Sequence, residues 1–124
     1  MLPHFCATMD TWDPIIVNTL AQTHPLILLD FPGVSHSTGK ASSTFAAIAI
    51  KVINFVSLIK VSQVDLLGFS ISGCVAQIVV VNGPLGLIRK LIIASTGPTV
   101  GPDTVSRQTL PEEGKAASRN LDLK

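Results

Sequence analysis

The residues with the clearest chemical potential lie in the segment Gly68-Phe69-Ser70-Ile71-Ser72. A short apolar run at residues 64–67 comes just before this segment, and a helix-like segment at residues 72–81 follows it. A serine between a strand and a helix, flanked by small residues, is typical of a turn that holds a nucleophilic hydroxyl above a sheet. The spacing therefore predicts an activated serine at position 70.

Such a turn makes two demands on the backbone around the serine. We expect Ser70 to adopt a positive φ, which is unfavourable for a residue with a Cβ. We also expect the strand and the helix to approach each other closely, so that the flanking positions must be small. Gly68, Ser72 and Gly73 meet this demand, although Ser72 adds a Cβ and a hydroxyl where the usual pattern has a second glycine.

Apolar runs and helix-length segments alternate along the chain. The short runs predict buried strands at residues 26–29, 64–67 and 91–94. The segments around them predict helices at residues 13–23, 43–59 and 72–81. This alternation predicts an α/β fold with a mostly parallel sheet and flanking helices.

Residues 3 to about 102 resemble the N-terminal half of a known family. Residues 64–77 are similar to the pattern V-D-L-L-G-F-S-x-G-G-x-V-A-Q, and residues 30–37 to a D-x-x-G-x-G-x-S loop with Ser35 at a common glycine position. Residues 3–14 resemble an oxyanion loop with its following helix, and residues 91–98 resemble the next strand and its exit. Together these segments resemble the α/β-hydrolase family, of the esterase and cofactor-free haloperoxidase type.

The resemblance implies a serine hydrolase that acts on an ester-like or small acyl substrate, without a cofactor or a metal. Ser70 would be the nucleophile, and the backbone N–H groups of Phe5 and Ile71 would donate to the oxyanion. His4 would shape the oxyanion loop and would not act as a base. The remaining elbow positions are Gly68, Ser72 and Gly73.

The other members of a catalytic triad are not evident in the sequence. In this family the order along the chain is serine, then Asp or Glu, then histidine, but His4, His24 and His36 all precede Ser70. Asp103 is a weak candidate for the acid. We therefore expect a partial α/β-hydrolase fold, truncated at both ends, that has no turnover by itself. The alternative is a non-catalytic remnant, either a pseudoenzyme or a binding module.

Charged residues are concentrated at the C-terminal end of the chain. Residues 103–124 hold 8 of the 17 charged side chains, whereas residues 1–102 are largely apolar. We expect residues 1–102 to form the partial domain, and residues 103–124 to be a polar tail that is disordered or begins a cap region. The expected first strand, residues 26–29, would have an unpaired edge through which copies of the chain could associate.

Composition argues against several other functions. The net charge is +1 and no basic stripe is present, so a nucleic-acid partner is not expected. No apolar stretch reaches the roughly 18 residues of a membrane span, and the absence of a signal-peptide pattern favours the cytoplasm. Cys6 and Cys74 lack metal-ligand spacing and are expected to be reduced thiols. Residues 33–42 resemble a phosphate loop but have the wrong glycine spacing.

Overall fold

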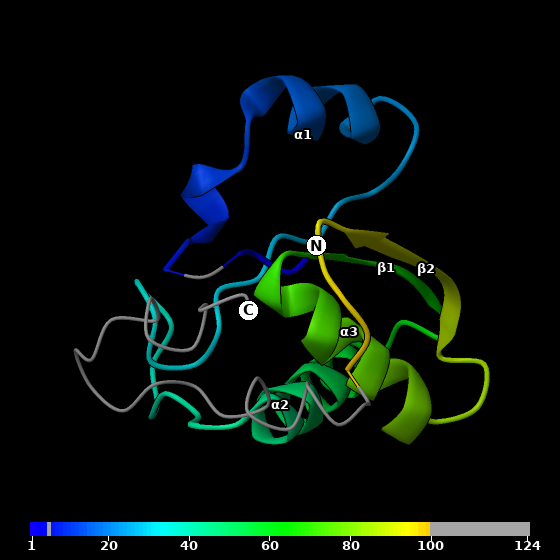
Figure 1. The fold of residues 1–124 in the computed structure, drawn as a ribbon. Coiled ribbons are helices and arrows are strands. Elements are labelled where there is room, and N and C mark those ends of the chain that lie inside the picture. The colour runs from blue at the N-terminus through cyan, green and yellow to red at the C-terminus, as the bar shows by residue number, and fades with distance from the viewer. Residues whose placement is uncertain (5, 100–124) are drawn as a thin grey trace.

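The computed structural model describes residues 1–4 and 6–99. Its elements, in chain order, are the 3₁₀-helix η1 (Met9–Thr11), α1 (Pro14–Ala21), α2 (Phe45–Leu58), β1 (Val64–Phe69), α3 (Ile71–Asn82) and β2 (Ile88–Ala94). Figure 1 shows α2 and α3 on one side of the two strands and α1 on the other. The expected tail at residues 103–124, with Asp103, lies outside the described residues.

The described strands form a small parallel sheet. β1 and β2 pair in parallel from Val64 opposite Ile88 to Phe69 opposite Ala94, with one register shift after Val64. On the other side of β1, Leu2 forms an isolated parallel bridge with Gly68. Two parallel strands joined by a helix confirm the mixed α/β class.

The prediction of a strand at residues 26–29 is wrong. This segment is without regular structure, and its one hydrogen bond to the described residues comes from the Met1 amino group to the Ile27 oxygen. A strand needs a neighbour with which to pair along its length. Residues 1–4 lie beside β1 but form only the bridge at Leu2, so they give residues 26–29 no continuous partner.

The strand β2 begins three residues earlier than the apolar run indicated. Ile88, Arg89 and Lys90 are part of it, although two of them are charged. Arg89 is accommodated because its guanidinium binds both carboxylate oxygens of Asp65 on β1, at 2.8 and 2.6 Å. A cross-strand ion pair therefore extends the pairing beyond the apolar residues.

The helices lie within two residues, at each end, of the predicted ranges 13–23, 43–59 and 72–81. Asp13 caps α1 by accepting from the N–H of Ile15 at 2.8 Å, and Thr44 caps α2 by accepting from the N–H of Ala47 at 3.2 Å. The buried face of α2 consists of Phe45, Ile48, Ala49, Val52 and Val56. Two further apolar residues at helical spacing are not buried, since Ile53 is half-buried and Ile59 is 38% exposed.

The core lies between the sheet and the helices α2 and α3. Val75, Ala76 and Val79 of α3 are at most 1% exposed, and they pack with Leu66 of β1 and the buried stripe of α2. By contrast, α1 buries none of its residues, and Ile15 is 75% exposed. No helix among residues 1–4 and 6–99 is long and apolar enough to cross a membrane.

Candidate active site

Ser70 occupies the tight turn between β1 and α3. Its φ is 57° and its ψ is −125°, a combination that residues with a Cβ rarely adopt. The turn is held on both sides, because the Ser70 N–H donates to the Ala94 oxygen and the Gly73 N–H donates to the Ser70 oxygen, both at 2.9 Å. The positive φ expected from the sequence is confirmed, and backbone strain of this kind is concentrated at functional sites.

Strand and helix meet closely on both sides of this turn. A Cβ on Gly68 would lie 2.5 Å from the Ser72 carbonyl oxygen and 2.8 Å from the Ala76 Cβ. A Cβ on Gly73 would lie 2.7 Å from the Cβ of Thr96, in the segment after β2. Carbon atoms in contact are about 3.5–4.0 Å apart, so neither glycine can be replaced without displacement. The requirement for small flanking residues is therefore confirmed.

The turn leaves two polar groups available. The Ser70 side chain does not cap α3, and among the described residues neither its hydroxyl nor the N–H of Ile71 has a hydrogen-bond partner. An N–H in the first turn of a helix has no acceptor within that helix. Ile71 can therefore donate to an oxygen bound beside Ser70. The other expected donor, the N–H of Phe5, lies outside the described residues.

The structure brings none of the three histidines into hydrogen-bond contact with Ser70. His4 packs edge-on against the Phe69 ring, with the ring centroids 5.6 Å apart. His24 follows α1, and its Nδ1 lies 2.7 Å from the Thr23 hydroxyl. His36 is exposed in the loop between residues 30 and 38. His4 therefore contacts the residue that precedes Ser70.

A buried carboxylate to which the sequence assigned no role of its own binds the chain at the start of η1. Asp30 is 6% exposed, and its Oδ1 accepts from the N–H of Met9 at 2.6 Å. Trp12, just after η1, packs against Phe69 with a centroid distance of 6.2 Å. The Asp30 Oδ2 and the Trp12 indole N–H are both buried, and neither has a partner among the described residues. The sequence feature that could have pointed to Asp30 is its position between the apolar run at residues 26–29 and the turn at Pro32-Gly33.

The side-chain amide of Gln77 makes a second set of contacts that the sequence did not indicate. It joins α3 to the segment after β2. Its Nε2 donates to the Gly97 oxygen at 2.9 Å and to the Gly73 oxygen at 3.2 Å, and its Oε1 accepts from the Thr99 N–H at 3.1 Å. The Thr99 hydroxyl adds a bond to the Cys74 oxygen at 3.2 Å. These bonds hold residues 97–99 against the helix that begins at Ser70.

Ser72 makes the most buried polar contact near the turn. Its hydroxyl donates to the carbonyl oxygen of Pro3, a residue that lies 69 positions away in the sequence. Ser72 is fully buried and Pro3 is less than 2% exposed. The sequence marked Ser72 only as a larger substitute for glycine, whereas the structure gives its hydroxyl a partner.

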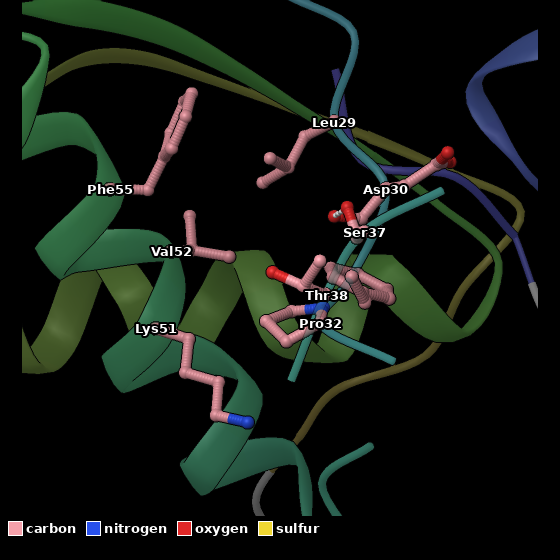
Figure 2. A pocket seen from close by; sticks show the side chains of 9 residues that line it. Leu29, Asp30, Pro32, Ser37, Thr38, Lys51, Val52 and Phe55 are labelled. Atoms are coloured by element: carbon pink, nitrogen blue, oxygen red, sulfur yellow. Dashed lines mark hydrogen bonds between the residues drawn. The ribbon is translucent and has the colours of Figure 1, made fainter. Parts of the chain in front are cut away.

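A separate cavity of about 220 Å³ lies between α2 and the loop that follows residue 29. Figure 2 shows Val52 and Phe55 of α2 on one side and Pro32 and Thr38 of the loop on the other, while the Asp30 carboxylate points away from the helix. Its lining contains none of the predicted site residues, and it is smaller than the roughly 300–1,000 Å³ of ordinary ligand pockets. We therefore place the candidate site at Ser70 and not in this cavity.

The described residues contain no cluster of three or more His, Cys, Asp or Glu that could hold a metal. Both cysteines are free, with Cys6 exposed and Cys74 buried. No protein-family model matches this chain, and no curated protein is significantly similar to it.

Proposed function

We propose that this chain carries the nucleophile half of a serine hydrolase of the α/β-hydrolase type. The Ser70 oxygen adds to the carbonyl carbon of an ester-like or small acyl substrate while its proton passes to a general base that the described residues do not supply, and the Ile71 N–H donates to the carbonyl oxygen as it becomes negative. The observation that carries the proposal is the backbone of Ser70, with φ 57° and ψ −125° at a strand-to-helix junction. A strained turn that presents a serine hydroxyl is typical of the nucleophile in hydrolases of this type.

The close packing around the turn supports the same proposal. Gly68 and Gly73 allow the strand, the helix and Thr96 to approach within distances that a Cβ would prevent. Because backbone strain persists only where the surrounding structure enforces it, this packing gives the unusual serine geometry a physical cause. The resemblance of residues 64–77 to the hydrolase pattern adds to it.

A second candidate function is a non-catalytic one, in which the fold is kept as a binding module. It is favoured by the environment of the Ser70 hydroxyl, which donates to no histidine nitrogen and no carboxylate oxygen among the described residues. A serine hydroxyl is a weak nucleophile without a general base. We therefore propose that residues 1–124 alone do not turn over an ester, even if Ser70 is reactive enough to be modified.

Labelling with a fluorophosphonate probe separates the two candidates. The hydrolase proposal expects one phosphonyl group on Ser70 of the wild type and none on Ser70→Ala. Ser95→Ala is a matched control, since Ser95 also follows a strand and has a positive φ of 51°. Labelling that persists in Ser70→Ala, or a wild type that remains unlabelled at high probe concentration, would count against the hydrolase and favour the binding module.

We also propose that copies of the chain associate through residues 26–29. The backbone of this segment makes one hydrogen bond to the described part of the chain, and Ile27 is 41% exposed. Backbone N–H and C=O groups that have no partner within the described part of the chain can pair with another chain, although residues 26–29 form no strand. No sequence feature points to a nucleic-acid partner, because the net charge is only +1.

A further inference from the structure

The strand β2 forms one outer side of the described sheet. In the described part of the chain it pairs with β1 alone. The Ala94 oxygen accepts from the Ser70 N–H, which directly follows β1, so the backbone groups of Ala94 face β1. Successive residues of a strand direct their N–H and C=O groups to opposite sides, so those of Ile93 and Leu91 face away from β1. This outer side of β2 can therefore accept a further strand.

The side chains of β2 favour an uncharged apolar partner. Ile92 is 49% exposed and Ile93 is 42% exposed, whereas the charged residues Arg89 and Lys90 lie near the other end of the strand. An antiparallel pair of two β2 strands that used their whole length would place Lys90 of one copy opposite Ile92 of the other. An apolar segment without charges avoids this mismatch and suits the outer side of β2 better than a second β2 does.

Residues 26–29 lie at the opposite side of the described sheet. Leu2 forms its bridge with β1 on the side away from β2. The Met1 amino group, next to Leu2, donates to the Ile27 oxygen at 2.6 Å. The order across the molecule is therefore residues 26–29, residues 1–4, β1 and β2, with an unpaired segment at each end.

The segment at residues 26–29 has the composition that the outer side of β2 favours. It contains no charged residue, and Ile27 is 41% exposed. Its apolar run is typical of a strand, but it has no continuous partner among the described residues. Because residues 26–29 and β2 lie at opposite ends of one sheet, they can meet only when they belong to different copies of the chain.

We propose that residues 26–29 of one copy pair with the outer side of β2 of a second copy. This inference rests on the proposed association through residues 26–29 and names the surface that they contact. The contact joins two different surfaces, so every copy in a pair retains one unused surface. Association of this kind is head-to-tail and continues beyond a dimer unless it closes into a ring. Residues 26–29 become a strand only in the assembly.

The test blocks the two surfaces separately in the full chain. Ile93→Pro removes an N–H that faces away from β1, and its ring obstructs a further strand. Ile27→Lys places a charge in the other surface, and Ile15→Lys, on the exposed side of α1, is the matched control for the added charge. Sedimentation equilibrium gives the mass of each protein and of an equimolar mixture of the two blocked variants. Circular dichroism verifies that each variant is folded.

We expect the wild type and Ile15→Lys to form species larger than a dimer as the concentration rises. Each blocked variant alone should associate only at about 10-fold higher concentration, the scale of a lost hydrogen bond between chains. The mixture of Ile27→Lys and Ile93→Pro should form a one-to-one dimer at the concentration at which the wild type associates. It should grow no further, because it offers one intact surface of each kind.

Three results would overturn the inference and leave association itself in place. One is an Ile93→Pro variant that associates like the wild type, which would mean that residues 26–29 contact another surface. Another is an Ile27→Lys variant that associates like the wild type, as expected if two β2 strands pair. The third is a mixture of the blocked variants that stays monomeric. A wild type that is monomeric at every concentration would overturn the inference and the proposed association together.

Hydrogen exchange in the wild type provides a second test, without any substitution. The Ile93 amide and alternate amides of residues 26–29 should exchange with deuterium more slowly in the assembly than in a dilute, monomeric sample, because they gain partners between copies. Equal exchange in the two samples would overturn the inference. If Ile93→Pro does not fold, Ile93→Lys takes its place in the mixture, with the same expected masses.

Discussion

The backbone N–H of Ser70 donates to the carbonyl oxygen of Ala94 over 2.9 Å, and this bond fastens the strained turn to the end of β2. Ser70 is therefore held at φ 57° and ψ −125° by the sheet and not by its own preference. Glycine adopts such a conformation without the steric cost that a Cβ brings. Because the bond to Ala94 imposes this conformation, glycine at position 70 should be more stable than alanine.

We expect Ser70→Gly to have a higher free energy of unfolding than Ser70→Ala, by about 1–2 kcal/mol. Both variants lose the hydroxyl, so the comparison isolates the Cβ at a positive φ. Urea denaturation followed by circular dichroism measures the difference. Equal stabilities, or a less stable glycine variant, would mean that the turn at position 70 is not strained.

The close contact between Gly73 and Thr96 predicts that Gly73→Ala destabilises the protein and that a smaller residue at position 96 restores part of the lost stability. Gly73→Ala places a Cβ 2.7 Å from the Thr96 Cβ and 3.0 Å from its Oγ1, and we expect it to lower the free energy of unfolding by about 1–3 kcal/mol. Thr96→Gly removes both atoms. The double variant should therefore lose less stability than the sum of the two single variants.

A double-mutant cycle measures this coupling from the unfolding free energies of the four proteins. Strictly additive losses would show that Gly73 is small for a reason other than its contact with Thr96.

The Gln77 amide predicts a local change in hydrogen exchange. Gln77→Ala removes the acceptor of the Thr99 N–H and the donor to the Gly97 oxygen. We expect the free energy of unfolding to fall by about 1–3 kcal/mol, because partly buried backbone groups lose their partners. The Thr99 amide should then exchange with deuterium faster than in the wild type.

Gln63→Ala is the matched control for that experiment. The Gln63 side chain makes one exposed bond, to the Gly86 oxygen at 2.9 Å. We expect it to leave both the stability and the exchange of the Thr99 amide nearly unchanged. Unaltered exchange at Thr99 in the Gln77 variant would argue that the amide does not hold this segment.

The ion pair between Asp65 and Arg89 predicts a dependence of stability on pH. The hydrogen bonds from Arg89 lower the pKa of the Asp65 carboxyl below its ordinary value of 3.8. The pair therefore stabilises the folded state above pH 4, and this contribution is lost as the pH falls through the lowered pKa. Thermal unfolding between pH 2 and pH 7 measures the effect, which is small because the pair is exposed to solvent.

Asp65→Asn should remove that part of the pH dependence, and Arg89→Gln should remove it as well, since the guanidinium is its main cause. If Arg89→Gln keeps the wild-type profile below pH 4, the pair does not lower the pKa of Asp65.

Association through residues 26–29 predicts a mass that depends on concentration. We expect the weight-average mass in sedimentation equilibrium to rise with concentration in the wild type. Ile27→Lys should reduce the association, because a charge within the segment opposes pairing with another chain. Ile15→Lys, on the exposed side of α1, is the control and should associate like the wild type. Equal masses for the wild type and Ile27→Lys would exclude this edge as the contact.

The elements around the candidate site were predictable because their signals are local. The Asp13 and Thr44 caps, the apolar stripe of α2 and the small residues at Gly68 and Gly73 all lie within a few positions of the structure that they specify. Strand pairing is not local. The apolar run at residues 26–29 resembled a strand, but no segment among residues 1–4 and 6–99 pairs with it along its length, whereas Arg89 and Lys90 joined β2 through contacts across the sheet.

The sequence by itself determined the turn at Ser70, since a serine flanked by small residues between a strand and a helix has few other arrangements. Only the tertiary structure decided what surrounds it. The bonds from Ser72 to Pro3 and from Gln77 to Thr99 join residues that are 69 and 22 positions apart. Such partners meet because the helix, the sheet and the N-terminal segment pack on one another. A local sequence pattern does not specify that packing.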